Sequence, residues 1–212
     1  MQQRLQRTFA RQFARPRGPL GQLAARLMRS GNASLNLWMV ELLEVEPEDR
    51  ILEVGFGPGV ALAAFLGRAQ RGLVAGVDAS ASMANQARAR HRQAIAEGRL
   101  QIHEGDASSL PYDDETFDKV CGAHVIYFWA DPVRTLRELN RVLRPKGSLA
   151  LGYQERAHMP PRAAQGLALA GATLVSPGEV EDLVRRAGFN GVRLETKPGP
   201  TRPAGFCVIG IK

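Results

Sequence analysis

The stretch Ile51–Gly59 constrains the fold of this chain more than any other part of it. It reads Ile-Leu-Glu-Val-Gly-Phe-Gly-Pro-Gly, so apolar strand formers run directly into three glycines at alternate positions. The apolar residues that follow, 60–66, are typical of the start of a buried helix. A strand, a glycine-rich turn and a helix in this order form the first unit of a nucleotide-binding α/β domain.

The spacing of the glycines narrows the choice of ligand. A dinucleotide-binding turn has the pattern G-x-G-x-x-G/A; Gly55 and Gly57 fit its first two positions, but Val60 occupies the third. A P-loop ends in Gly-Lys-Ser/Thr, and this stretch has no such ending. On this stretch alone, a tight turn without a ligand stays open as an alternative.

Strands and helices are predicted to alternate along the chain. The predicted strands are 50–54, 73–77, 100–104, 119–123, 148–152, 192–195 and 206–211. The predicted helices are 20–29, 35–43, 60–68, 82–96, 132–143 and 177–187. This order predicts an α/β fold with a doubly wound, mostly parallel seven-stranded sheet. The last two strands are joined by the Pro- and Gly-rich loop 197–205, so they are expected to form a C-terminal antiparallel hairpin.

Acidic residues follow the second and third predicted strands. Asp78 ends the second strand, and Asp106 follows the third in the sequence Glu-Gly-Asp-Ala. A carboxylate at the first of these points can accept two hydrogen bonds from a ribose diol. Both positions lie at the carboxyl ends of strands, where ligands of such sheets bind.

These motifs resemble those of the class I S-adenosylmethionine-dependent methyltransferases, in particular the type 11 methyltransferase domain of the small-molecule branch. The pattern E-x-G-x-G-x-G starts at Glu53, and D-x-S-x-x-M-x-x-x-A starts at Asp78. Residues 124–147 resemble the branch that includes quinone and lipid-headgroup enzymes. The Asn/Asp-Pro-Pro-aromatic motif of nucleic-acid amino-methyltransferases does not occur there. The resemblance covers residues 45–152 by sequence and the rest of the C-terminal part by topology.

The resemblance implies a Rossmann-like fold with S-adenosyl-L-methionine as cofactor and no metal. It places Glu53 and the backbone of Gly55 at the amino-acid portion of the cofactor, and Asp78 at the ribose. The cofactor-binding residues that it implies are Glu53, Gly55, Gly57, Gly59, Asp78, Ala79, Met83, Asp106, Ala107 and His124.

The adenine contacts are also implied by the resemblance. Ala79 and Met83 are expected to pack near the adenine ring. Asp106 is expected to accept a hydrogen bond from the exocyclic amine, while the backbone amide of Ala107 donates to the ring. Taken singly, Asp78 could be a helix cap and Met83 a core residue.

Methyl transfer from a sulfonium is an in-line displacement that needs alignment more than covalent help. A hydroxyl acceptor would also need a general base. His124, at the mouth of the fourth strand, is the first candidate catalytic residue and Tyr127 the second, with packing in the core as the alternative for each. The acceptor pocket is expected between the N-terminal arm and residues 154–175.

The positive charge of the chain is concentrated near its N-terminus. Residues 1–40 contain seven arginines and no acidic residue, which accounts for the net charge of +7. Residues 1–15 fit an amphipathic basic helix. Such an arm could be a lid over the ligand, a contact to an anionic surface, a transit peptide or a solvated tail. We therefore divide the chain into a basic arm with helices, 1–44, and an S-adenosylmethionine-binding domain, 45–212.

Composition excludes several other classes. No stretch approaches the ~18 consecutive apolar residues of a membrane span, and no secretory signal is evident. Cys121 and Cys207 are far apart in apolar runs, which predicts buried thiols and a cytoplasmic protein rather than a metal site or disulfides. The sequence thus predicts a methyltransferase acting on a small molecule, with no clear nucleic-acid partner. The alternatives are an NAD-dependent oxidoreductase and a non-catalytic ligand-binding protein with a basic arm.

Overall fold

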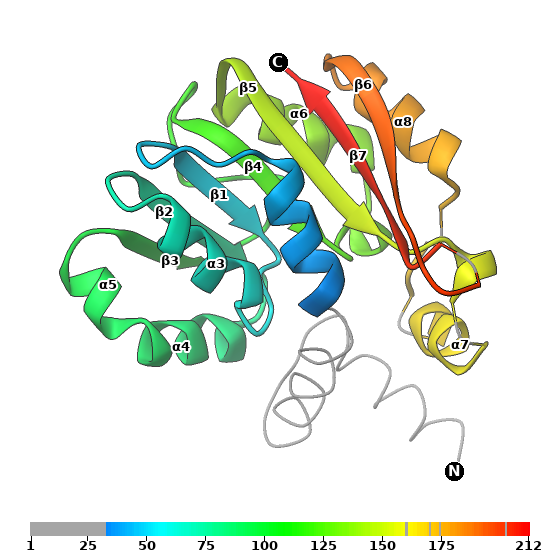
Figure 1. The fold of residues 1–212 in the computed structure, drawn as a ribbon, viewed down its shortest axis with the longest axis horizontal. Coiled ribbons are helices and arrows are strands. Elements are labelled where there is room, and N and C mark those ends of the chain that lie inside the picture. Colours follow the sequence, from blue (N-terminus) through cyan, green and yellow to red (C-terminus); the bar gives the residue numbers. More distant parts are fainter. Residues whose placement is uncertain (1–32, 160, 170, 174, 202) are drawn as a thin grey trace.

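The computed structural model describes residues 33–159, 161–169, 171–173, 175–201 and 203–212 (Figure 1). The expected basic arm and the expected helix 20–29 lie outside the described residues. The first described element is a helix at 33–42, close to the expected 35–43.

A seven-stranded sheet with the strand order β3-β2-β1-β4-β5-β7-β6 forms the centre of the molecule. Its strands are β1 (Arg50–Val54), β2 (Leu73–Asp78), β3 (Leu100–Glu104), β4 (Phe117–Ala123), β5 (Leu143–Tyr153), β6 (Asn190–Lys197) and β7 (Gly205–Ile211). Strands β1 to β5 are parallel, and β7 runs antiparallel to both β5 and β6. The α/β class, the mostly parallel sheet and the C-terminal antiparallel hairpin are therefore confirmed.

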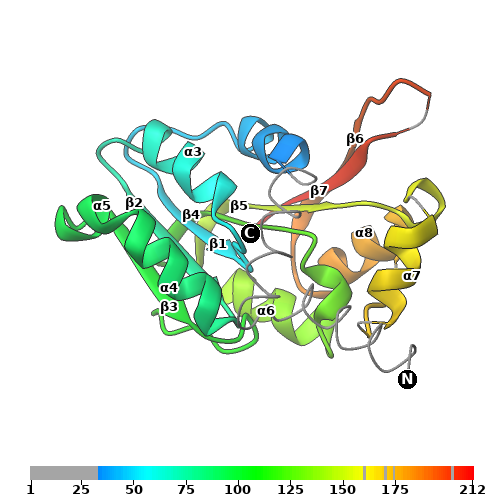
Figure 2. The same cartoon turned by 90° about the horizontal axis from the view of Figure 1, so that it is seen from below.

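Helices cover both faces of the sheet (Figures 1 and 2). They are α3 (Val60–Arg68), α4 (Ala81–Arg90), α5 (Arg92–Ala96), α6 (Pro132–Val142), α7 (Pro161–Leu169) and α8 (Pro177–Arg186), with short 3-10 turns η1 (Ile126–Phe128) and η2 (Arg156–His158). One apolar cluster joins the sheet to the helix 33–42, α3 and α4, and another joins it to α6 and α8. The sheet is thus buried on both sides, as parallel sheets usually are.

Helix starts follow the local chemistry of the chain. The Asp131 carboxylate accepts from the Arg134 amide at 3.0 Å, and Pro132 occupies the first turn of α6. In α8, the Ser176 amide and hydroxyl both donate to Glu179, which completes the expected capping box. These caps determine the residues at which α6 and α8 begin.

Two helical segments differ from the sequence-based expectation. The expected helix 82–96 is broken at His91, whose φ of −110° and ψ of 27° separate α4 from α5. Helix α7 lies within the segment 154–175, for which no helix was expected. Pro161 stands at its start, where a missing N–H costs nothing.

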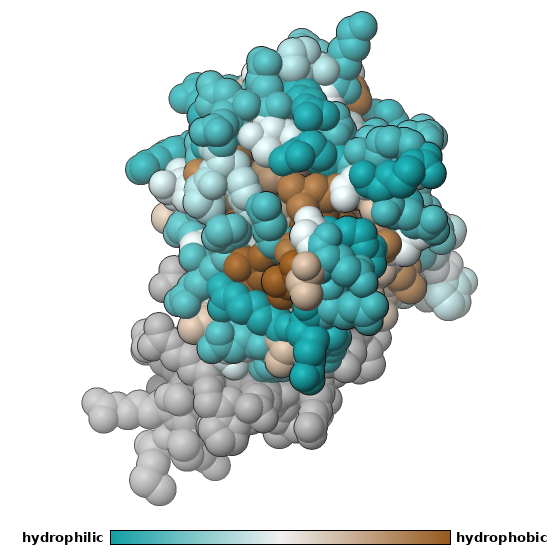
Figure 3. All heavy atoms as spheres, turned by 90° about the vertical axis from the view of Figure 1, so that its left-hand side faces the viewer, coloured by the Kyte–Doolittle hydropathy of each residue, from teal (hydrophilic) through white to brown (hydrophobic). Residues whose placement is uncertain are grey.

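One edge of the sheet is formed by β3, in which Gln101 and Glu104 are exposed. Figure 3 views the molecule from this side and shows polar residues over most of the described surface, with apolar surface gathered near the middle. Polar side chains along an edge strand oppose pairing with another chain. Among the described residues, no helix is long and apolar enough to cross a membrane.

Candidate active site

The glycine turn after β1 requires three glycines for conformational reasons. Gly55, Gly57 and Gly59 have φ angles of 62°, 49° and 70°, in the left-handed region that L-residues with a Cβ avoid. A Cβ on Gly55 would also lie 2.3 Å from Cγ1 of Val125. The turn therefore packs tightly against the loop that follows β4 at Gly55, whereas nothing lies within 4 Å of where a Cβ on Gly57 would be.

Asp78, at the end of β2, fixes this turn. Its Oδ2 accepts from the Gly57 amide and its Oδ1 from the Ser80 amide, both at 2.8 Å. Burial raises the pKa of Asp78, while the two amides oppose that rise. Each carboxylate oxygen can accept a second hydrogen bond, so Asp78 can hold the turn and still accept from a diol.

Glu53 lies at the other side of the turn and is only 2% exposed. Its Oε2 has no hydrogen-bond partner within the described part of the chain. Burial, and then the nearby Asp78 charge, raise the pKa of Glu53. A buried carboxyl oxygen without a partner is costly, so this position suits a ligand that brings an ammonium group. The residues present thus fit the amino-acid portion of S-adenosylmethionine.

Asp106 follows β3, the strand that pairs with β2 and thus with Asp78. Asp106 is exposed, and its Oδ1 accepts from the Ser108 amide at 2.8 Å. Ala107 is half-buried, and Ala79 is exposed at the end of β2. Because β3, β2 and β1 are adjacent and parallel, these residues meet the glycine turn at one edge of the sheet.

Met83 is placed differently from the other candidates. It is fully buried in the apolar cluster beneath α4, where Ser80 caps the helix by accepting from the Met83 amide at 3.4 Å. In this structure its side chain is part of the core, and an adenine contact stays a prediction.

His124 follows β4 in a left-handed conformation, with φ of 58°. Its amide donates to the Gly152 carbonyl at 2.7 Å, and its ring Nδ1 lies 3.4 Å from the Tyr127 hydroxyl. The ring is half-buried, and loss of hydration lowers the pKa of His124 to about 4. The imidazole is therefore neutral near pH 7 and can accept a proton.

Tyr127 is buried, and its hydroxyl is engaged by the backbone of Gln154. It donates to the Gln154 carbonyl at 2.8 Å and accepts from the Gln154 amide at 2.6 Å. Burial raises the pKa of Tyr127 above its usual value. The hydroxyl therefore holds the backbone of Gln154 in place. Direct participation of Tyr127 in catalysis stays a prediction.

Two residues that the sequence did not point to lie next to the glycine turn. Arg90 Nη1 donates to the Pro58 carbonyl at 2.7 Å. His91 Nε2 is buried without a hydrogen-bond partner in the described chain, 3.9 Å from where a Cβ on Gly59 would lie. Both belong to the end of α4, and no local pattern connects them with residues some 32 positions earlier.

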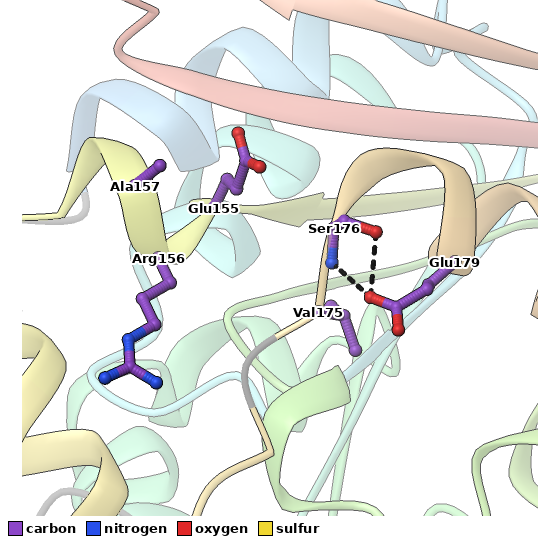
Figure 4. A pocket seen from close by; sticks show the side chains of 6 residues that line it. All are labelled: Glu155, Arg156, Ala157, Val175, Ser176 and Glu179. Carbon is purple, nitrogen blue, oxygen red and sulfur yellow. Dashed lines mark hydrogen bonds between the residues drawn. The ribbon is translucent and has the colours of Figure 1, made fainter.

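A surface hollow of ≈ 490 Å³ lies beyond the carboxyl end of β5 (Figure 4). The residues that line it are Glu155, Arg156, Ala157, Val175, Ser176 and Glu179. Glu179 is held by Ser176, and Glu155 lies 2.9 Å from Nδ1 of His158. The hollow overlaps the segment 154–175 that was expected to form one wall of the acceptor pocket.

Other predicted properties can be compared with the described residues. Cys121 and Cys207 are buried free thiols, as expected. No cluster of three or more metal-ligating side chains occurs among the residues for which the structure gives positions.

The strand order and the acidic residues around the glycine turn define an α/β nucleoside-binding protein of the Rossmann-like type. Residues 52–151 match the family model described as a methyltransferase domain. This match and the observed fold support a class I S-adenosylmethionine-dependent methyltransferase, with S-adenosylmethionine as its cofactor.

Individual relatives agree with this family. Methyltransferase GfsG of Streptomyces halstedii is 30% identical over 177 residues, which are 81% of this chain and 63% of GfsG. The 27-O-demethylrifamycin SV methyltransferase of Amycolatopsis mediterranei is 33% identical over 111 residues, 52% of this chain and 40% of that enzyme. The match thus spans less than two thirds of each of these curated relatives.

A solved structure extends the similarity to the whole fold. It is a SAM-dependent methyltransferase from Thermotoga maritima, described as a possible histamine N-methyltransferase. It is 26% identical, with a TM-score of 0.69, covering 88% of this chain and 94% of that chain.

Proposed function

We propose that this protein transfers the methyl group of S-adenosylmethionine to a small-molecule acceptor. The observation that carries the proposal is the pair of buried carboxyl groups, Glu53 and Asp78, on either side of a turn with three left-handed glycines. When bound, the cofactor supplies a sulfonium methyl group that is already activated for displacement. The chain has to bind the cofactor, align the acceptor and exclude water.

Different residues of the chain can bind different parts of the cofactor. Glu53 provides a buried oxygen without a partner for the ammonium group, and Asp78 retains acceptor capacity for the ribose hydroxyls. Asp106 and the Ala107 amide, beside them on the sheet edge, offer an acceptor and a donor, which suit the edge of adenine. Together these groups would fix the nucleoside with its reacting end toward His124.

The small-molecule acceptor is supported by the surroundings of His124. A neutral imidazole at the mouth of β4 can take a proton from a hydroxyl acceptor. The hollow beyond β5 is lined by Glu155 and Arg156, which directly follow Gln154, the residue that the Tyr127 hydroxyl contacts. The names of the relatives, which include a demethylrifamycin and a possible histamine methyltransferase, point to small acceptors in this family.

Calorimetric titration with S-adenosylhomocysteine and, separately, NADH tests the ligand class. We expect binding of S-adenosylhomocysteine alone, and a weakening of at least tenfold in Glu53→Gln, which keeps the side-chain shape but removes the charge. Glu104→Gln is the matched control, because Glu104 is an exposed glutamate at the end of β3. Binding of NADH instead would favour an oxidoreductase, and binding of S-adenosylhomocysteine without transfer to any acceptor would favour a non-catalytic binding protein.

The domain division and the role of the basic arm also stay proposals. We infer that residues 45–212 form the cofactor-binding domain and that the arginines near the N-terminus contribute to the acceptor side or to contact with an anionic surface. Charge neutralisation of Arg4, Arg7 and Arg11 is expected to raise the KM for an anionic acceptor. An unchanged KM would exclude the arm from acceptor binding.

A further inference from the structure

The Tyr127 hydroxyl links the loops that follow two neighbouring strands. Tyr127 lies in η1, after β4, while Gln154 directly follows β5. The hydroxyl accepts from the Gln154 amide at 2.6 Å, donates to the Gln154 carbonyl at 2.8 Å and lies 3.4 Å from His124 Nδ1. Three polar groups therefore converge on one phenolic oxygen.

The proton count at this oxygen assigns the tautomer of His124. A phenol has one proton and two lone pairs. The carbonyl of Gln154 can only accept, so the phenolic proton goes to it. The Gln154 amide can only donate, so it uses one lone pair. The lone pair that is left can be matched only by a donor, so Nδ1 carries the hydrogen and Nε2 has the free electron pair.

The surrounding structure keeps this arrangement rigid. Tyr127 is 1% exposed, and its ring packs edge to face against Phe128 at 6.2 Å. The Thr173 amide donates to the Tyr127 carbonyl at 2.8 Å, and the His124 amide donates to the Gly152 carbonyl at 2.7 Å. The backbones of both residues are thus held by hydrogen bonds, and the Tyr127 ring cannot move without breaking the two bonds of its hydroxyl to Gln154. A preorganised environment of this kind fixes the direction in which a base presents its electron pair.

We propose that Tyr127 is a positioning residue that holds His124 in its Nδ1–H tautomer, so that Nε2 is the atom that accepts the proton of a hydroxyl acceptor. This inference rests on the proposed function. The acceptor oxygen would form the new bond to the methyl carbon while its proton passes to Nε2. The electron pair of the broken carbon–sulfur bond stays on sulfur, and the positive charge passes from the sulfonium to the imidazolium, which then releases its proton to water.

The tautomer can be measured without any acceptor. The chain has four histidines, so protein labelled with 15N-histidine gives few ring signals, and His124→Asn identifies those of His124. At pH 7.5 we expect Nδ1 of His124 to show the shift of a protonated nitrogen and Nε2 that of an unprotonated one. In Tyr127→Phe the Nε2–H form should become populated. A wild-type His124 with the hydrogen on Nε2 would overturn the proposal, as would a tautomer that Tyr127→Phe leaves unchanged.

A second tyrosine provides the control for loss of a buried hydroxyl. The Tyr112 hydroxyl is buried without a hydrogen-bond partner within the described residues, so Tyr112→Phe removes the same atom without breaking a bond. It should leave the His124 signals and kcat unchanged. If Tyr127→Phe fails to fold because the Gln154 groups lose their partner, the wild-type spectrum alone decides the tautomer.

Kinetics then separate positioning from binding. Once an acceptor is known, Tyr127→Phe should lower kcat by about 10- to 100-fold and His124→Asn by about 100-fold or more, with KM for S-adenosylmethionine unchanged. The double variant should be no slower than His124→Asn alone, because Tyr127 acts through His124. Unchanged kcat in both single variants would refute the proposal, whereas failure to bind S-adenosylhomocysteine would refute the proposed function itself.

Discussion

Asp78 Oδ2 accepts a hydrogen bond from the Gly57 amide at 2.8 Å, so the acidic residue of β2 fixes the glycine turn that follows β1. The same carboxylate binds the Ser80 amide through Oδ1, at the start of α4. One buried side chain thus joins the glycine turn to the start of α4. Ligand binding and local stability are expected to depend on it together.

Asp78→Asn should therefore weaken both properties. The amide nitrogen of asparagine cannot accept, so the Gly57 or the Ser80 amide loses its partner, at a cost of about 1–3 kcal/mol. We expect the affinity for S-adenosylhomocysteine to fall at least tenfold and the urea midpoint of unfolding to fall as well. Asp113→Asn, at an exposed aspartate, is the control and should change neither quantity. Wild-type affinity in Asp78→Asn would exclude a ribose contact.

Gly55→Ala should destabilise the protein more than Gly57→Ala. Both positions have positive φ, but only at Gly55 would the new Cβ meet an atom, Cγ1 of Val125 at 2.3 Å. We expect a loss of about 1 kcal/mol at Gly57 from backbone strain alone. At Gly55 the loss should be larger by about 1–3 kcal/mol because of overpacking.

A double variant separates the two causes at Gly55. Val125→Ala removes the clashing methyl group. In the Gly55→Ala background it should therefore recover the stability lost to the steric clash, while the cost of backbone strain remains. Denaturant unfolding of the four proteins gives the coupling energy. Strict additivity of the two single effects would show that the contact is not responsible.

His124 should make stability depend on pH in a defined window. Its pKa is lowered to about 4 in the folded protein by burial, from an ordinary value near 6.5. Between these two values the unfolded chain binds the extra proton, so the histidine's contribution is complete above about pH 6.5 and is lost as the pH falls toward 4. Urea unfolding of wild type and His124→Asn at pH 4.5 and 7.5 should show a larger loss of stability at pH 4.5 in the wild type than in the variant. Parallel pH dependence in both proteins would contradict the low pKa.

The same pKa predicts the pH dependence of the reaction. A base with a pKa of about 4 is unprotonated throughout the range from pH 5.5 to 8. We therefore expect kcat to be nearly constant over this range. A tenfold rise in kcat per pH unit below pH 6.5 would assign the proton transfer to a group with an ordinary histidine pKa.

Much of the fold could be predicted because local patterns and tertiary packing agree. The strands 50–54 and 100–104 and the helix 60–68 were predicted with the observed bounds, since apolar runs end at clear turn or glycine signals. The break at His91 was not predicted, because the residues around it are ordinary helix formers. Helix α7 was missed because its short apolar pattern follows a loop-like segment.

The site could be predicted only in part. Glycine spacing and acidic residues at strand ends can be predicted from the sequence, because these residues come directly after the strand in the chain. The Tyr127–Gln154 pair joins residues 27 positions apart, and the contact of Arg90 with Pro58 spans 32. Such pairings depend on how neighbouring loops pack, and the unpartnered oxygen of Glu53 depends on the same packing.

A crystal structure with S-adenosylhomocysteine tests the central claim most directly. The account predicts the two ribose hydroxyls within hydrogen-bond distance of the Asp78 carboxylate, the amino group at Glu53 and the adenine beside Asp106. Ligand density elsewhere, or a nucleoside bound without contact to Asp78 and Glu53, would contradict it.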